Sequence, residues 1–167
     1  ALLRVENVDL KFVTKDSIFP SRRQYVRACN NISFEIFEGE TFGLVGESGS
    51  GKSTIARAIT GLYPPDTGKI FFEGIDLTAL KGEHERRPLR RQMQMVFQNP
   101  YSSMNPRMKV RDIIAEPIRF HKLASSESQI QGIVSDLLDH VGLGRGAGVK
   151  YPHEFSGGQR QRISIAR

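Results

Sequence analysis

One eight-residue run constrains the fold of this chain more than any other feature: Gly-Glu-Ser-Gly-Ser-Gly-Lys-Ser at residues 46–53. It follows a short apolar run at residues 41–45 that is fit for a buried strand. Residues 53–62, which follow the run, have a helical pattern, and Pro64-Pro65 would end that helix. Between a strand and a helix, a glycine-rich loop closed by lysine and serine binds phosphate groups. The run therefore predicts a nucleotide-binding unit of α/β type.

The spacing of this run has a chemical reason. Glycines let the backbone turn tightly so that several N–H groups point inward, and the following helix adds positive partial charge at its N-terminus. Lys52 places a full charge against the β and γ phosphates, and Ser53 supplies a hydroxyl for Mg²⁺. The residues expected to bind the nucleotide are Gly46, Glu47, Ser48, Gly49, Ser50, Gly51, Lys52, Ser53 and Thr54.

The two halves of the chain differ in periodicity. Alternating apolar residues predict strands at 3–12, 32–37, 68–73 and 93–97, with a polar loop at 14–27 and a turn at 38–40. Residues 110–120 and 128–141 have helical periodicity instead. The second helix has one apolar stripe that we expect to be core: Ile130, Ile133, Val134, Leu137, Leu138 and Val141. This order indicates an α/β body with an inserted helical part.

Composition excludes several classes of protein. With 167 residues, of which 38% are apolar, the chain can bury one ordinary core. It has no apolar run of about 18 residues, so we expect a soluble protein that meets a membrane only through a partner. The single Cys29 rules out an internal disulfide, and no zinc site is expected around it. The net charge of +6 comes mostly from scattered basic residues, so no nucleic-acid partner is expected.

A second motif, Phe-Ser-Gly-Gly-Gln-Arg-Gln-Arg at residues 155–162, indicates the family. It resembles the signature of ATP-binding cassette (ABC) proteins, with Phe155 in the place of the usual leucine. A plainer alternative is that Ser156 caps a helix and that the two glycines form a flexible lead-in. Gln98, which follows the alternating run at 93–97, is similar to the glutamine of the same family's Q-loop, although a lone glutamine is normally a surface residue.

Further runs narrow the resemblance to one branch of that family. Residues 96–108, 112–117 and 151–155 are similar to the ATP-binding subunits of oligopeptide and dipeptide importers, and the resemblance covers nearly all 167 residues. Phenylalanine in place of this leucine is familiar in that branch. Related branches import glutathione or nickel complexes, so the transported solute stays open.

The resemblance implies a fold and a division of the chain. The expected fold class is α/β: a P-loop NTPase (RecA-like) core with an N-terminal antiparallel β subdomain and an inserted α-helical subdomain, truncated at its C-terminal end. Residues 1–97 would form the nucleotide-binding core with the β subdomain and the P-loop. Residues 98–155 would form the Q-loop and the helical subdomain, and residues 156–167 the signature and the start of its helix.

The resemblance also implies cofactors and roles. The cofactors are ATP and Mg²⁺, with Lys52 and Gln98 as catalytic residues and with Ser53 and Gln98 near the metal. The adenine would stack on Phe12, which family position favours, or on Tyr25. The signature would form a second anion site at a helix N-terminus, for the ATP held by another subunit. Its residues are Ser156, Gly157, Gly158 and Gln159.

The implied partners are a second cassette and a permease. Two such domains pair head-to-tail, as a homodimer or a heterodimer. Residues 98–120 would bind a short cytoplasmic helix of the transmembrane permease, with Tyr101, Met104 and Met108 as apolar contacts. The alternative is that these three side chains pack inside the subdomain. The protein would lie in the cytoplasm, on the inner face of the cell membrane.

Two parts of a complete ATPase of this family are not found. They are a strand that ends in Asp-Glu and a later switch histidine near the γ-phosphate; His84, His121, His140 and His153 all precede the signature. We therefore expect a piece of a longer ATPase, with little or no turnover on its own. One alternative is a module that binds nucleotide without hydrolysis. Another, a DNA-repair or chromosome ATPase, agrees with the basic charge but not with the compact spacing of the motifs.

Overall fold

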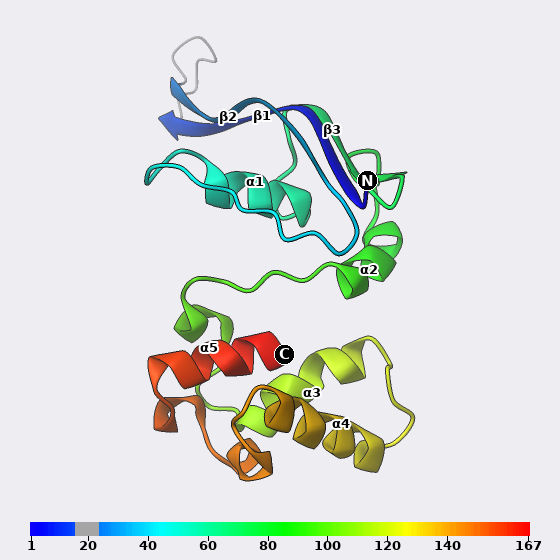
Figure 1. Cartoon of the computed structure of the whole chain (residues 1–167), viewed down its shortest axis with the longest axis vertical. Coiled ribbons are helices and arrows are strands. Elements are labelled where there is room, and N and C mark those ends of the chain that lie inside the picture. Colours follow the sequence, from blue (N-terminus) through cyan, green and yellow to red (C-terminus); the bar gives the residue numbers. More distant parts are fainter. Residues whose placement is uncertain (16–23) are drawn as a thin grey trace. The chain divides into compact units, whose positions relative to one another are not determined.

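The computed structural model describes residues 1–15 and 24–167, which form two compact units. The first unit is Ala1–Gln94 and the second is Met95–Arg167. Strands occur in the first unit and most of the helices in the second (Figure 1). In the part of the chain that the structure describes, no helix is long and apolar enough to cross a bilayer.

The first unit is built on an antiparallel sheet with the strand order β2-β1-β3-β4. Its strands are β1 (Leu3–Lys15), β2 (Gln24–Ile36), β3 (Thr67–Phe72) and β4 (Ile75–Asp76). Leu3 fixes the register on both sides of β1, opposite Ile36 of β2 and Phe72 of β3. The expected N-terminal antiparallel sheet is therefore present.

The first two strands are longer than the sequence predicts. The polar composition indicates a loop at residues 14–27, but β1 continues to Lys15 and β2 begins at Gln24. Phe12 pairs with Val26 and Val13 with Tyr25. Cross-strand hydrogen bonding thus outweighs the polar composition of this stretch. Residues 16–23 lie outside the described residues.

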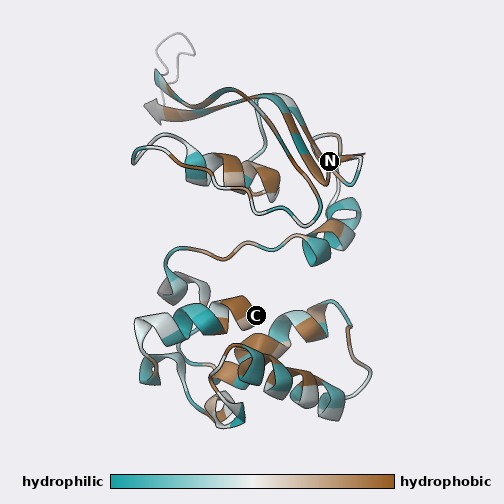
Figure 2. Cartoon of the chain, viewed as in Figure 1, coloured by the Kyte–Doolittle hydropathy of each residue, from teal (hydrophilic) through white to brown (hydrophobic). Residues whose placement is uncertain are grey.

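One face of the sheet packs on helix α1 (Lys52–Ile59). Four apolar residues of β1 enter this core, together with Ile55 and Ala58 of α1 and Ile70 of β3. Those of β1 are Leu3, Val5, Val8 and Leu10. Figure 2 shows apolar stretches along the strands and in α1. The predicted helix ends at Ile59 rather than at Leu62, because Gly61, with φ 73°, reverses the chain before the two prolines.

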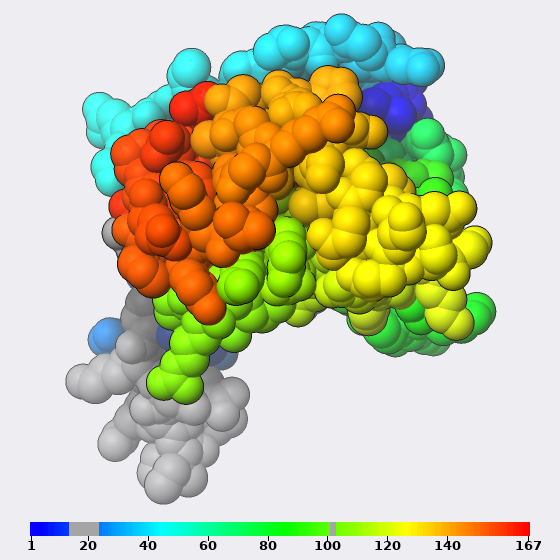
Figure 3. All heavy atoms as spheres, turned by 90° about the horizontal axis from the view of Figure 1, so that it is seen from below, coloured from blue at the N-terminus to red at the C-terminus, as the bar shows by residue number. Residues whose placement is uncertain are grey.

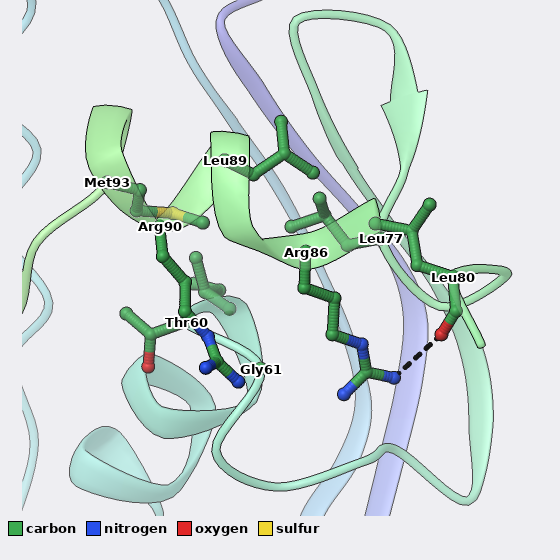
Figure 4. A pocket seen from close by; sticks show the side chains of 9 residues that line it. Thr60, Gly61, Leu77, Leu80, Arg86, Leu89, Arg90 and Met93 are labelled. Atoms are coloured by element: carbon green, nitrogen blue, oxygen red, sulfur yellow. Dashed lines mark hydrogen bonds between the residues drawn. The ribbon is translucent and has the colours of Figure 1, made fainter. Parts of the chain in front are cut away.

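Helix α2 (Glu83–Gln92) also packs on this core through Leu89. Leu89 and Met93 line a cavity of about 30 Å³ with Leu77 and Leu80, and the cavity also reaches the end of α1 (Figure 4). Arg86 donates a hydrogen bond of 2.8 Å to the carbonyl of Leu80 at its edge. Helix α2 is rich in charged residues and contacts the core mainly through Leu89, with Met93 directly after the helix.

Two predicted strands do not form. Residues 41–47 and 93–97 have no regular secondary structure, and Val45 is 90% exposed. A strand is stabilised by the ladder it makes with a neighbour, and no strand within residues 1–15 and 24–167 pairs with either segment. Apolar alternation alone is therefore insufficient evidence for these strands.

The second unit is helical. It contains α3 (Val110–Phe120), α4 (Glu127–His140) and α5 (Gly157–Ala166). Three short 3₁₀ segments connect or precede them: η2 (Pro100–Ser103), η3 (Arg145–Val149) and η4 (Pro152–Glu154). Figure 3 shows the segment from α4 to α5, yellow to red, as one packed surface.

The core of this unit joins all three helices. Its most buried members include Val110, Ile113 and Ile114 of α3, Val134 and Leu138 of α4, and Ile163 of α5. The predicted stripe of α4 is mostly correct: Ile130, Val134 and Leu138 are buried, and Leu137 and Val141 are partly buried. Ile133 is an exception at 37% exposure, because the buried row follows the i, i+4, i+8 positions.

A glycine in β3 gives a test of the sheet. Gly68 has φ 87°, and a Cβ there would collide with the main-chain carbonyls of Glu6 and Asn7. Gly74 has φ 79°, with nothing within 4 Å of the same position. We expect Gly74→Ala to lower the free energy of unfolding by about 1 kcal/mol, from backbone strain alone. Gly68→Ala should lower it by about 2–4 kcal/mol, because the collision adds to that strain.

Urea unfolding followed by circular dichroism measures both glycine variants. Equal losses for Gly68→Ala and Gly74→Ala would contradict the close approach of β3 to Glu6 and Asn7 of β1.

Candidate nucleotide-binding site

The glycine-rich loop of residues 46–51 rests against strand β2. Gly51 has φ 92° and precedes α1 as its N-cap. A Cβ on Gly51 would overlap the carbonyl oxygen of Ala28 and come within 3.7 Å of the sulfur of Cys29. Burial raises the pKa of the Cys29 thiol, which keeps it neutral under the loop. Only glycine fits this contact, so the sheet fixes where the loop ends and α1 begins.

Lys52 closes the loop on itself. Its Nζ donates hydrogen bonds to the carbonyls of Gly46 at 2.7 Å and Glu47 at 2.6 Å, and to Oγ of Ser50 at 3.3 Å. All three acceptors are uncharged oxygens of the loop. The ammonium is therefore held at the centre of the loop while its charge stays unneutralised by these partners.

The start of α1 adds to this positive field. The first turn of the helix has no acidic side chain, so the positive end of its dipole keeps its strength. The N–H groups of Thr54 and Ile55 both donate to the carbonyl of Gly51 at 2.9 Å, which tightens the first turn. The loop and the helix together present N–H groups and positive charge that suit an anion.

The exposed hydroxyl of Ser53 lies at the same helix terminus and suits one ligand position of Mg²⁺. Within the described ranges, no cluster of three or more His, Cys, Asp or Glu residues could hold a metal ion. The Ser53 hydroxyl fits one ligand position of a magnesium ion whose other ligands would include phosphate oxygens.

The two candidate aromatic residues lie on opposite faces of the β1–β2 ribbon. Because Phe12 is opposite Val26 and Val13 is opposite Tyr25, Phe12 and Tyr25 point to different sides. Phe12 contacts Tyr63, which follows α1, with ring centroids 5.2 Å apart and planes at 77°. Phe12 is thus on the side of the sheet that carries the loop and α1.

The signature motif forms the N-terminus of α5. Oγ of Ser156 accepts a hydrogen bond from the N–H of Gln159, and Oε1 of Gln159 accepts one from the N–H of Ser156. The capping role proposed as the plainer alternative for Ser156 is therefore present. Gly157 and Gly158 have open space where a Cβ would lie, so their N–H groups can be approached by a ligand.

Two residues of the signature motif anchor it in the second unit. Phe155 is buried in the core of the second unit, which explains why another large apolar residue can replace leucine there. Arg160 is 8% exposed, and its Nη1 donates to the carbonyl of Pro152 at 3.2 Å.

The residues expected around the Q-loop have mixed outcomes. Gln98 is exposed in a bend, and the residues before it have no regular secondary structure. Met104 is 6% exposed and belongs to the helical core, so the alternative of packing inside is correct for this side chain. Met108 is partly buried beside it. The side chain of Tyr101 lies outside the described part of the structure.

A cavity of about 340 Å³ opens beside these residues, within the second unit. It is lined by Ser103, Met104, Asn105, Met108, Ile113, Glu116 and Arg167. Arg167 donates hydrogen bonds to the carbonyl of Ser103 and, at 3.1 Å, to the carboxylate of Glu116.

Comparison with known proteins agrees with these two motifs. A family model described as ABC transporter matches residues 29–167. The chain is 52% identical over 166 residues to the oligopeptide transport ATP-binding protein OppF of Streptococcus mutans, covering 99% of this chain and 52% of that protein. It is 47% identical over 166 residues to the protein of the same name from Bacillus subtilis, with 99% and 52% covered. The chain thus spans about half the length of these curated relatives.

Solved structures agree with the sequence matches. The dimeric structure of a post-hydrolysis state of the ATP-binding cassette MJ0796 bound to ADP and Pi superposes with a TM-score of 0.84 and 27% identity, over 98% of this chain and 67% of that one. The family model includes both the phosphate cradle and the signature, and it matches most of the chain. The chain therefore belongs to the ABC transporter family.

Proposed function

We propose that this chain is the nucleotide-binding part of the ATP-binding subunit of an ABC importer. It binds ATP with Mg²⁺, and the whole protein hydrolyses the ATP to drive uptake of oligopeptides or a related solute. The observation that carries the proposal is the position of Lys52, whose ammonium is held inside the glycine loop at the N-terminus of α1. Oligopeptide uptake is supported by the names of the relatives, which are oligopeptide transport proteins.

The residues of the loop have different roles in the proposed binding of ATP. The cradle, from Gly46 to Thr54, surrounds the phosphates with N–H groups, and Lys52 exchanges its carbonyl acceptors for β and γ phosphate oxygens. Ser53 holds Mg²⁺, which supplies a positive charge that bridges the phosphates. Gln98 is proposed to reach the magnesium ion or the attacking water, so that Lys52 and Gln98 are the catalytic residues of this half of the protein.

The second anion site supports a dimer. The open N–H groups of Gly157 and Gly158, with Ser156 and Gln159, are proposed to bind the nucleotide of a second ABC domain in a head-to-tail pair. The related ATP-binding cassette with ADP and Pi is also dimeric.

The permease is the second proposed partner. Residues 98–120 are proposed to bind a transmembrane subunit on the cytoplasmic face of the membrane, and the 340 Å³ cavity, which combines Met104 and Met108 with polar and charged residues, offers a hollow for a short amphipathic helix. The proposed division into residues 1–97, 98–155 and 156–167 assigns this contact to the helical subdomain.

The charge of Lys52 can be tested directly. Lys52→Ala should weaken binding of Mg²⁺–ATP by about 10- to 100-fold or more, because charge-assisted hydrogen bonds to the phosphates are lost. Lys81→Ala, which removes an exposed lysine before α2, is the matched control and should bind as the unchanged protein does. Isothermal titration calorimetry gives both affinities. Undiminished affinity of Lys52→Ala would refute the phosphate cradle.

A second test distinguishes Phe12 from Tyr25 as the residue that stacks on adenine. Phe12→Ala should weaken ATP by about 5- to 100-fold, the usual loss for one stacked base, and leave tripolyphosphate binding unchanged. Tyr25→Ala should leave both affinities unchanged, because its side chain lies on the other face of the ribbon. Competition binding with the two ligands measures this. The assignment is wrong if Tyr25→Ala shows the larger loss for ATP.

A further inference from the structure

We propose that Tyr63 is a positioning residue for the nucleotide base: it holds the ring of Phe12 and connects it, through Arg57, to the helix that carries Lys52. The inference rests on the proposed function, because it assumes that Phe12 stacks on adenine. It assigns a role to a residue that lies in neither of the two motifs of the family.

The first observation is the contact between the two rings. The centroids of Phe12 and Tyr63 are 5.2 Å apart with their planes at 77°, which is the preferred edge-to-face arrangement. Phe12 is 37% exposed, so part of its surface stays open to a ligand while Tyr63 holds another part. The contact restricts the rotation of a side chain that would otherwise be mobile on an open ribbon.

The second observation is the way Tyr63 is held. The N–H groups of Leu62 and Tyr63 both donate to the carbonyl of Arg57, at 2.8 and 3.2 Å. The guanidinium of Arg57 lies 5.7 Å from the centre of the Tyr63 ring, and its Nη1 donates to the phenol oxygen at 3.4 Å. The main chain and the side chain of Arg57 thus fix the same tyrosine.

The third observation is a pair of hydrogen bonds that join Asp66, three residues after Tyr63, to strand β1. The carboxylate of Asp66 accepts a hydrogen bond of 2.6 Å from the N–H of Lys11, and the N–H of Asp66 donates to the carbonyl of Asp9 at 2.9 Å. Pro64 and Pro65 lie between Tyr63 and Asp66 and restrict the backbone of this segment. The chain after α1 is therefore tied to β1 immediately before Phe12.

These contacts give α1 two functions. Lys52 is its first residue and Arg57 is in its last turn, about 7 Å further along the axis. One rigid eight-residue helix thus connects the phosphate cradle to the ring that meets the base. The separation between the two binding elements is set before any nucleotide arrives, which lowers the entropy lost on binding.

The test compares two ligands, Mg²⁺–ATP and tripolyphosphate, in calorimetric titrations. Tyr63→Ala should weaken ATP by about 3- to 10-fold, which corresponds to the loss of one edge-to-face pair, and change tripolyphosphate by less than about twofold. Tyr63→Phe keeps the ring and loses only the 3.4 Å hydrogen bond from Arg57, so it should weaken ATP by less than about twofold. Tyr63→Leu keeps the apolar bulk without the ring and should weaken ATP as Tyr63→Ala does, so it serves if the alanine variant does not fold.

A double variant distinguishes positioning from general destabilisation. If Tyr63 acts through Phe12, Phe12→Ala combined with Tyr63→Ala should bind ATP no more weakly than Phe12→Ala alone. Additive losses, or an equal loss for ATP and tripolyphosphate, would overturn the inference while leaving the effect of Lys52→Ala intact. Failure of the unchanged protein to bind either ligand would overturn the proposed function and this inference together.

Discussion

The contact between Gly51 and the main chain of β2 is the constraint on which the nucleotide site depends. Because a side chain at Gly51 would overlap the Ala28 carbonyl, the loop meets the sheet at one place only. From that point α1 begins, Lys52 turns back over the loop, and Ile55 and Ala58 enter the core under β1. A backbone contact between residues distant in the sequence thus determines both the packing of α1 in the first unit and the direction in which that helix runs.

Local patterns in the sequence predict local structure well. The predicted helix at Val110–Phe120 has the observed bounds, and α4 agrees within one residue at each end, since apolar periodicity and end signals lie within the helix itself. The predicted strands at 41–45 and 93–97 are wrong, because a strand depends on a partner that its own sequence does not contain. For the same reason β1 and β2 are longer than their alternation indicates.

In the candidate site, too, local motifs can be predicted from the sequence and contacts between distant residues cannot. The candidate loop residues and the capping role of Ser156 come from motifs with fixed spacing, so the sequence alone proposes them, whereas the return hydrogen bond to Gln159 is seen only in the structure. It is not enough for Tyr63 and Ala28, because they act through contacts with residues far away in the chain: Tyr63 meets Phe12, and Ala28 meets Gly51. The tyrosine before two prolines is a visible signal of a fixed turn, but nothing in the sequence indicates which ring it touches.

The hydrogen bonds that Lys52 makes within its own loop imply selectivity for the number of phosphate groups in a ligand. In the proposed binding mode Lys52 would give up its hydrogen bonds to two carbonyls and a hydroxyl, and phosphate oxygens would have to replace these three acceptors. A triphosphate presents more negatively charged oxygens for this exchange than a monophosphate does. Under the proposed function, a ligand with several phosphate groups should therefore displace these internal hydrogen bonds more readily than a small anion does.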